Sequence, residues 1–291
     1  MLRDNLFILL QYLLPQHPIS RLMHVFTRLR VRWIKNVFTR WFIGHFGIDM
    51  SEAAEADYRV YPDFNSFFTR ALKPDVRPLD SKPGAVLCPV DGAVSQAGRI
   101  EGDAIFQAKG HTFSLHTLLG GSDRWTQVFT DGTFATLYLS PKDYHRIHMP
   151  LSGTLQDVIH IPGRLFSVNP LTTRKVPGLF ARNERVACLF ETDLGPMGLV
   201  LVGAINVASI ETVWQGVITP PAGKRIRHWD YRDQNLGLEA GAEMGRFNMG
   251  STVIVLFGPD RVEWDARIDA EASVRMGERL GLGIGAGMAK Q

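Results

Sequence analysis

Short apolar runs separated by turn residues fill the chain from about Ala85 onward. They include "FATLYL", "GTLQDVIHI", "RVACLFE" and "TVIVLF", each bounded by Gly, Pro or Asp. Runs of this length with many β-branched residues are typical of buried strands, and their close spacing favours antiparallel or barrel-like sheets over repeating βαβ units. Short helices are expected at 63–72, with Asp63 as the N-cap, and at 112–120. The pattern predicts an α+β fold with a strand-rich main domain.

A different pattern occupies the first 48 residues. "LFILLQYLL" (6–14) is an apolar run too short to span a bilayer, and Pro15 and Pro18 interrupt it. Over 19–46, large apolar side chains alternate with basic ones at helical spacing. This is typical of an amphipathic helix lying in a membrane interface; the alternative is that its apolar face packs on the protein's own core. We expect neither a cleavable signal peptide nor a transmembrane segment. The two patterns divide the chain into a helical arm, 1–62, and a main domain, 63–291.

Charge is distributed unevenly between the arm and the rest. The net charge is +3, but residues 1–48 hold seven basic residues against the single acid Asp4, and the remainder is slightly acidic. A basic arm could serve nucleic acid or an anionic membrane surface. Its basic residues are interleaved with large apolar ones, whereas binding along a phosphate backbone favours a solvated basic face, so we expect no nucleic-acid partner.

The length and the cysteines describe an ordinary folded protein. The chain has 291 residues, 45% of them hydrophobic and 21% charged, enough for a large core. Cys88 and Cys188 lie in apolar runs 100 positions apart, without metal-type spacing. We expect both to be buried free thiols in a reducing compartment, with a structural disulfide as the alternative.

Three short stretches carry residues capable of chemistry. "CPVDG" (88–92) places Asp91 in a tight turn after a strand, "SPKDYHRIHMP" (140–150) holds His145 and His148, and Gly250-Ser251 precedes the strand "TVIVLF". The simplest interpretation is a capping acid, two loop histidines and a turn. The chain order Asp, His, Ser also fits a nucleophilic triad, and therefore a membrane-associated Ser-His-Asp lipid hydrolase.

Other readings of these stretches are weaker. The nucleophile-elbow pattern Gly-x-Ser-x-Gly is absent around Ser251. A zinc site on His145 and His148 is conceivable, but neither complementary cysteines nor a His-Glu-x-x-His helix accompanies the pair, so no metal is expected. A binding module without chemistry is a third alternative.

The sequence resembles the phosphatidylserine decarboxylases of the bacterial and mitochondrial type over nearly its whole length. The motifs that carry the resemblance stand in the family's order: "FNSFFTRALKPDVRPLD" (64–80), "CPVDG" (88–92), "LSPKDYHRIHMP" (139–150), "LFSVNP" (165–170), "LFARNERV" (179–186), "VLVGAINVASIETVW" (200–214) and "FNMGSTVIVLF" (247–257). One departure is visible. Many bacterial members have Leu where this chain has Met249, a residue of similar size and polarity.

The resemblance implies self-cleavage between Gly250 and Ser251. Glycine has no Cβ, so its carbonyl is open to attack by the Ser251 hydroxyl, with His148 as general base oriented by Asp91. The products would be a large chain, 1–250, and a small chain, 251–291, in which Ser251 becomes a covalent pyruvoyl cofactor. The headgroup amine of phosphatidylserine would form a Schiff base with that ketone and lose carbon dioxide, giving phosphatidylethanolamine. His145, beside His148, is the expected aid to decarboxylation or reprotonation.

The family substrate also gives the arm a purpose. A diacyl lipid resists leaving its bilayer, so the enzyme must go to the membrane. The resemblance implies a peripheral protein on the cytoplasmic face of the bacterial inner membrane, in contact with phosphatidylserine and anionic lipids. It also suggests a homodimer. The sequence does not fix the acyl-chain preference.

Overall fold

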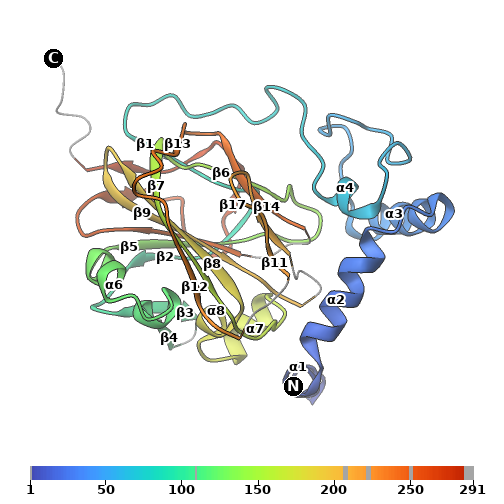
Figure 1. Cartoon of the computed structure of the whole chain (residues 1–291), viewed down its shortest axis with the longest axis horizontal. Coiled ribbons are helices and arrows are strands. Elements are labelled where there is room, and N and C mark those ends of the chain that lie inside the picture. The colour runs from blue at the N-terminus through green and yellow to red at the C-terminus, as the bar shows by residue number, and fades with distance from the viewer. Residues whose placement is uncertain (1, 109, 206–208, 221–223, 249–251, 285–291) are drawn as a thin grey trace.

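The computed structural model describes residues 2–108, 110–205, 209–220, 224–248 and 252–284. Figure 1 shows strand-rich layers forming the main body, with helices α1 to α4 gathered at one end of the molecule. This arrangement confirms the expected α+β class. The boundary expected between residues 62 and 63 stays a prediction.

A large antiparallel sheet occupies the centre of the body. Its strands lie in the order β12 (Arg227–Asp230), β7 (Gly153–Ile161), β8 (Arg185–Thr192), β9 (Gly195–Val202), β15 (Thr252–Phe257), β5 (Thr133–Tyr138), β2 (Gly92–Arg99) and β17 (Ser273–Val274), and β13 (Gly237–Leu238) also pairs with β7. In the part of the chain that the structure describes, β12 and β17 end this order without pairing with each other. The sheet is open, so the barrel-like alternative is wrong.

Three smaller sheets complete the body. The second sheet has the strand order β11 (Gly216–Thr219), β10 (Ile210–Thr212), β14 (Glu243–Phe247) and β6 (Arg146–His148). The third has the order β1 (Ala85–Leu87), β18 (Arg279–Gly283) and β16 (Val262–Trp264). The fourth pairs β3 (Ala104–Ala108) with β4 (His111–Ser114). Short helices α5 (Leu115–Leu118), α6 (Asp123–Phe129), α7 (Pro170–Lys175) and α8 (Leu179–Arg182) connect the strands.

Strand β15 lies at the middle of the core. All six of its residues are buried, and it pairs along its full length with β5 on one side and β9 on the other. A strand that is covered on both faces has apolar residues at successive positions, whereas a strand with one exposed face alternates apolar and polar residues. This explains the apolar segment "TVIVLF". Cys88 and Cys188 are buried free thiols in the same core, as expected.

Two helical predictions are corrected in detail. The expected helix at 63–72 is the shorter α4 (Phe64–Phe68), and its predicted cap is confirmed because the Asp63 side chain accepts a hydrogen bond from the Ser66 N–H. The expected helix at 112–120 begins as β4, because His111–Ser114 pairs with β3, and only Leu115–Leu118 is helical.

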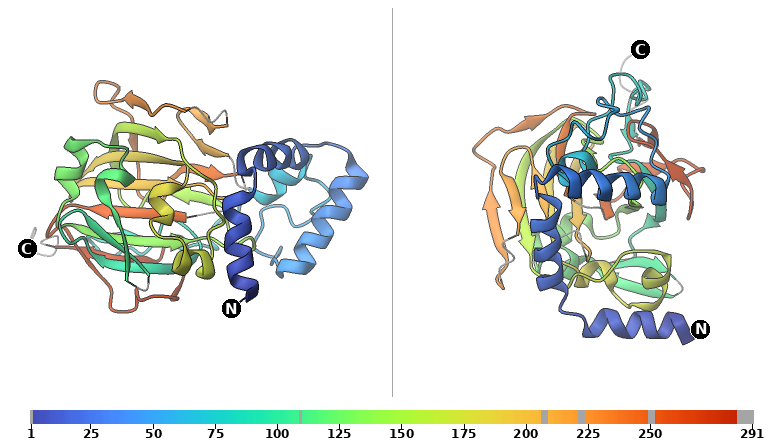
Figure 2. Two further views of the ribbon diagram at one scale, coloured as in Figure 1. Left: turned by 90° about the horizontal axis from the view of Figure 1, so that it is seen from below. Right: turned by 90° about the vertical axis from the view of Figure 1, so that its right-hand side faces the viewer.

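The arm consists of three helices, and two of them cover the segment 19–46, where one amphipathic helix was expected. They are α1 (Leu2–Leu13), α2 (Gln16–Thr27) and α3 (Arg32–Phe46), and residues 28–31 separate the last two. Figure 2 shows them beside the sheets at one end of the molecule. A small apolar cluster separate from the main core joins α3 to α4: Phe42, Ile48, Phe64, Phe67 and Phe68.

Candidate active site

Four strand ends of the large sheet meet beside residues 249–251. In the register of the sheet, Thr252, the first residue of β15, lies opposite Tyr138 of β5 and Val202 of β9. Tyr138 lies in turn opposite Ala93 near the start of β2. The turn that holds Asp91 leads directly into β2. The fold therefore places this acid at the same edge of the sheet as Thr252, the first residue of β15.

The histidine stretch reaches the same edge from the second sheet. Strand β6 pairs with β14, which opposes His148 to Glu243, and the Phe247 N–H donates to the His145 carbonyl at 3.1 Å. The His148 N–H donates to the Pro89 carbonyl at 2.9 Å, which ties β6 to the Asp91 turn. His148 thus ends β6, the strand beside β14, and His145 immediately precedes β6.

Gly250 and Ser251 lie outside the described residues. The structure fixes their immediate neighbours, Asn248 and Thr252. Asn248 is held on three sides: its N–H donates to the Ser209 carbonyl at 3.0 Å, its side-chain amide donates to Ser209 Oγ at 2.9 Å, and its side-chain oxygen accepts from Asn65 at 3.0 Å. Thr252 is buried in the sheet. The two ends of the predicted cleavage segment are therefore well anchored.

The Asp91 carboxylate is bound by an arginine and a backbone N–H. Arg77 donates to both of its oxygens, with its Nη2 at 2.6 Å, and the Met276 N–H donates at 2.8 Å. The same Arg77 Nη2 donates to Glu52 at 2.6 Å, so the two acids share one guanidinium. The next residue, Gly92, has no room for a side chain, because a Cβ there would collide with the backbone carbonyl of Tyr138.

The hydrogen bonds of His148 define its tautomer. Nδ1 lies 2.7 Å from the Gly241 carbonyl oxygen, which can only accept, so Nδ1 carries the proton. Nε2 therefore keeps its lone pair and accepts from the Tyr144 hydroxyl at 2.9 Å. Burial lowers the pKa of His148, while burial raises the pKa of Tyr144 to about 12. The ring is thus held neutral, with its basic nitrogen at Nε2.

His145 is fully buried and has one free nitrogen. Its Nδ1 lies 2.7 Å from the Asp143 carbonyl oxygen, and its ring packs on Phe68 with 4.1 Å between ring centroids. Its Nε2 has no hydrogen-bond partner among the described residues. Burial lowers the pKa of His145 to about 3, so this ring is neutral at pH 7.

The structure brings the predicted residues to one edge without joining all of them. Among the described residues, no hydrogen bond links the Asp91 carboxylate to the His148 ring; Gly241 and Tyr144 orient the ring instead. The hydrogen bond to Gly241, then the charge of Glu243 and last that of Asp91, raise the pKa of His148 against the larger effect of burial. No group of three or more His, Cys, Asp or Glu in the described ranges is placed to hold a metal ion.

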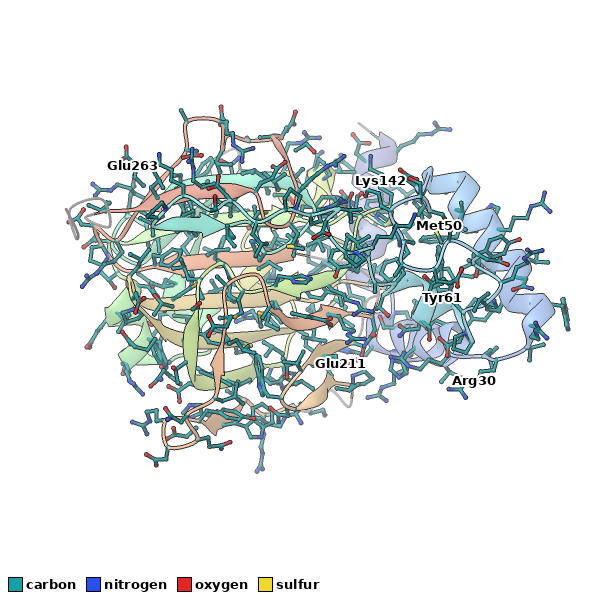
Figure 3. All side chains as sticks on the ribbon, turned by 90° about the horizontal axis from the view of Figure 1, so that it is seen from above. Arg30, Met50, Tyr61, Lys142, Glu211 and Glu263 are labelled. Carbon is teal, nitrogen blue, oxygen red and sulfur yellow. The ribbon has the colours of Figure 1, made fainter. Side chains whose placement is uncertain are left out.

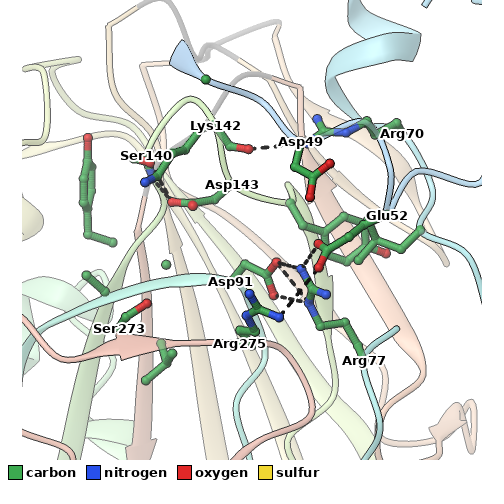
Figure 4. A pocket seen from close by; sticks show the side chains of 17 residues that line it. Asp49, Glu52, Arg70, Arg77, Asp91, Ser140, Lys142, Asp143, Ser273 and Arg275 are labelled. Atoms are coloured by element: carbon green, nitrogen blue, oxygen red, sulfur yellow. Dashed lines mark hydrogen bonds and ion pairs between the residues drawn. The ribbon is translucent and has the colours of Figure 1, made fainter. Parts of the chain in front are cut away.

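A polar cavity of about 490 Å³ opens beside Asp91. Figure 4 shows Asp91, Arg77 and Glu52 on one side of it and Ser140, Lys142 and Asp143 on the other. Its charged lining comes from segments far apart in sequence: Arg70, Arg77, Lys142 and Arg275, with Asp49, Glu52, Asp91 and Asp143. Lys142 lies at the junction of the helical end and the sheets, far from Glu263 (Figure 3).

Arg70, Arg77 and Tyr144 also lie at this site, although no pattern in the sequence predicted them as site residues. Arg70 and Arg77 both lie in the motif "FNSFFTRALKPDVRPLD", and Tyr144 immediately precedes His145. Their positions in these motifs were the available signal. Their contacts cross between elements that the local pattern does not connect.

Comparison with known proteins agrees with this arrangement. A family model described as phosphatidylserine decarboxylase matches residues 64–282, and one described as PSD matches residues 6–47. The chain is 58% identical to a phosphatidylserine decarboxylase proenzyme of Pseudomonas fluorescens, over 97% of this chain and 99% of that protein. Proteins of the same name from Pseudomonas putida (57% identity; 96% and 98% covered) and Stutzerimonas stutzeri (56%; 96% and 95%) are also similar. The chain therefore belongs to the phosphatidylserine decarboxylase family.

Proposed function

We propose that the protein converts phosphatidylserine to phosphatidylethanolamine with a pyruvoyl group made from its own Ser251. The observation that carries this proposal is the convergence of Asp91, His145 and His148 on the two strands that flank residues 249–251. The proenzyme names of the relatives support processing of a precursor. Family membership supports decarboxylation.

Self-cleavage requires a base for the Ser251 hydroxyl. In the proposed step, Ser251 Oγ attacks the Gly250 carbonyl carbon while Nε2 of His148 takes the hydroxyl proton, and the acyl group moves from nitrogen to oxygen. The fixed tautomer of His148 supports this role, because Nε2 carries the lone pair and Gly241 holds the ring. The Asp91 charge would stabilise the imidazolium that forms.

The ester is then opened by elimination. Loss of the Ser251 Cα proton and cleavage of its Cβ–Oγ bond would release Gly250 as a carboxylate and leave an N-terminal enamine on the small chain. Rearrangement of the enamine and hydrolysis by one water molecule release ammonia. The products are the chains 1–250 and 251–291.

The residues around position 251 fit a pyruvoyl group. Among the buried polar atoms that lack hydrogen-bond partners within the described residues are His145 Nε2 and Oγ1 of Thr252, the residue that follows position 251. The Thr252 hydroxyl can donate to a carbonyl oxygen, while the His145 Nε2 lone pair can accept a proton. When present, the group accepts the electrons left behind by departing carbon dioxide.

Replacing Ser251 with Ala tests the function directly. The variant should remain one chain on a denaturing gel and release no carbon dioxide from phosphatidylserine, because it lacks the attacking oxygen. Ser273→Ala, which removes a hydroxyl that lines the cavity beside Asp91, is the matched control and should split and turn over normally. An unsplit wild-type chain that hydrolyses the lipid and depends on Ser251 would instead establish the hydrolase.

His145 is proposed to serve decarboxylation rather than self-cleavage. Its Nε2 has no hydrogen-bond partner among the described residues, and because burial lowers the pKa of His145 to about 3, a proton held there would pass readily to the carbon that loses carbon dioxide. Proton transfer by a positioned side chain contributes on the order of a hundredfold or more to a rate.

His145→Ala should therefore split normally and lose about a hundredfold or more in turnover. His148→Ala is the paired variant and should fail to split. Chain splitting is followed on gels and turnover by release of carbon dioxide. A His145→Ala protein that stays folded but does not split would refute this division of roles.

The arm is proposed to bind the membrane surface. Its buried side chains include Gln16, Ser20, Thr27, Lys35 and Thr39. Its exposed ones include Leu13 and Leu22, each 70% exposed, and Trp33, 71% exposed. Large apolar side chains facing outward beside exposed arginines favour an anionic membrane interface. None of the described helices is long and apolar enough to cross a bilayer.

Polar contacts hold this outward-facing arrangement in place. The side-chain oxygens of Gln11 and Gln16 accept from the backbone N–H groups of Ser167 and Leu165, at 2.9 and 2.8 Å. Lys35 donates to the carbonyl oxygens of Tyr58 and Arg59, both at 3.1 Å. The arm thus turns polar side chains of α1 and α2 toward the protein, while α3 also packs Phe42 on α4. The exposed apolar side chains are left for another partner, which we take to be the bilayer.

Deleting residues 1–48 should weaken binding to anionic liposomes more than it impairs chain splitting.

Because α3 also packs on α4, a milder double variant, Leu22→Ser with Trp33→Ser, gives a sharper test. It should lower liposome binding about tenfold or more, since each side chain loses the free energy of burial in the interface. Val60→Ser, at a residue 64% exposed outside these helices, is the control. Equal liposome binding by the double variant and the wild type would refute the proposal.

A further inference from the structure

Arg70 is a buried cation with free donors beside the Asp91 cavity. It lies just after α4, is only 4% exposed and lines the cavity. Its guanidinium lies over the Phe67 ring, 5.5 Å from the centroid, and its Nη2 makes a long hydrogen bond of 3.4 Å to the Lys142 carbonyl. Its Nε and Nη1 have no hydrogen-bond partner within the described residues. Figure 4 shows Arg70 at the rim of the cavity, above Asp49.

The other cations of the cavity are placed differently. Arg77 is occupied by Asp91 and Glu52, and Arg275 is 61% exposed at its side chain and pairs with Glu52 at 3.6 Å. Lys142 is exposed. Burying a guanidinium without filling its donors is costly, and burial lowers the pKa of Arg70. Such a group beside a cavity is typical of an anion-binding site.

We propose that Arg70 binds the phosphodiester of the lipid headgroup through Nε and Nη2. This assignment rests on the proposed function and adds the group that positions its substrate. Nε–H and one N–H of Nη2 form a fork of parallel donors that matches two phosphate oxygens, which an ammonium group cannot do with the same geometry, and the second N–H of Nη2 is left for the long contact with the Lys142 carbonyl. Phosphate keeps its charge throughout decarboxylation, so binding it costs the reaction nothing.

The substrate carboxylate is a poorer partner for this arginine. Its negative charge disappears as carbon dioxide leaves, so a guanidinium on it would stabilise the ground state more than the transition state and slow the reaction. The place of Arg70 in the fold also favours phosphate. It follows α4, which packs on α3 of the arm, and it faces the cavity that reaches Asp91. A headgroup phosphate bound by Arg70 would lie between the arm, which we propose binds the membrane, and the substrate amine at the Asp91 cavity.

A binding experiment tests Arg70 without requiring turnover. Full-length protein in detergent is titrated with glycerol 3-phosphate as the phosphate probe and with lactate as the carboxylate probe, and binding is followed by ligand-observed NMR. Neither probe has an amine, so neither needs the pyruvoyl group. Glycerol 3-phosphate should bind the wild type, and Arg70→Gln should weaken that binding about tenfold or more, as expected for charge-assisted hydrogen bonds.

Two further variants separate recognition from charge and folding. Arg70→Lys keeps the charge but loses the fork, so it should bind glycerol 3-phosphate more weakly than wild type and more strongly than Arg70→Gln; it also provides the test if Arg70→Gln does not fold. Arg275→Gln, which removes an exposed cation from the same cavity, should change binding less than about threefold. Equal binding of glycerol 3-phosphate by wild type and the Arg70 variants, or no binding at all, would overturn the proposal.

Kinetics with a soluble short-chain phosphatidylserine then identify the phosphate source. Arg70→Lys should raise KM about tenfold with kcat within about threefold, because a group that is unchanged in the reaction contributes uniform binding. Weaker phosphate binding with an unchanged KM would mean a site for free phosphate and would overturn the headgroup assignment. Loss of lactate binding alone would assign Arg70 to the carboxylate. Failure of the chain to split would count against the proposed function and leave the binding result intact.

Discussion

The position of strand β15 is the constraint on which the rest of the site depends. Its six residues are buried and paired on both sides, so the backbone from Thr252 onward has little freedom. On the other side of residues 249–251, β14 and Asn248 are held by the second sheet and by Ser209. The described residues on the two sides of this segment, Asn248 and Thr252, are therefore held by separate parts of the fold.

A polar network connects that edge to the helical end. Asp91 and Glu52 share Arg77, and Glu52 also pairs with Arg275. Asn65 on α4 donates to Asn248 beside the cleavage segment, while Phe68 of the same helix packs on His145. The arm is therefore joined to the site through α4. In the proposed account, the surface that meets the membrane and the residues that process the chain belong to one connected structure.

The sequence allowed the strands and the candidate residues to be predicted, but not their hydrogen bonds. The run "TVIVLF" predicted a buried strand, because a strand that is buried on both faces has no alternation of apolar and polar residues. Asp63 was recognisable as an N-cap because it stands directly before the helical segment that is α4. The tautomer of His148 depends on the Gly241 carbonyl, 93 positions away, which no local pattern reveals. The Asp91 carboxylate was expected to orient the His148 ring, but it is bound instead by Arg77, which lies in the loop between α4 and β1. In the arm, the sequence pattern predicted amphipathic helix but not that polar residues such as Gln16 face the protein.

The central claim is that Ser251 becomes a pyruvoyl group, and intact mass under denaturing conditions tests it most directly. The account predicts two chains, one ending at Gly250 and one of 41 residues beginning at position 251. The smaller should be lighter, by one ammonia, than the same chain with an N-terminal serine. A single full-length mass from active enzyme, or a small chain that retains its serine, would contradict the account.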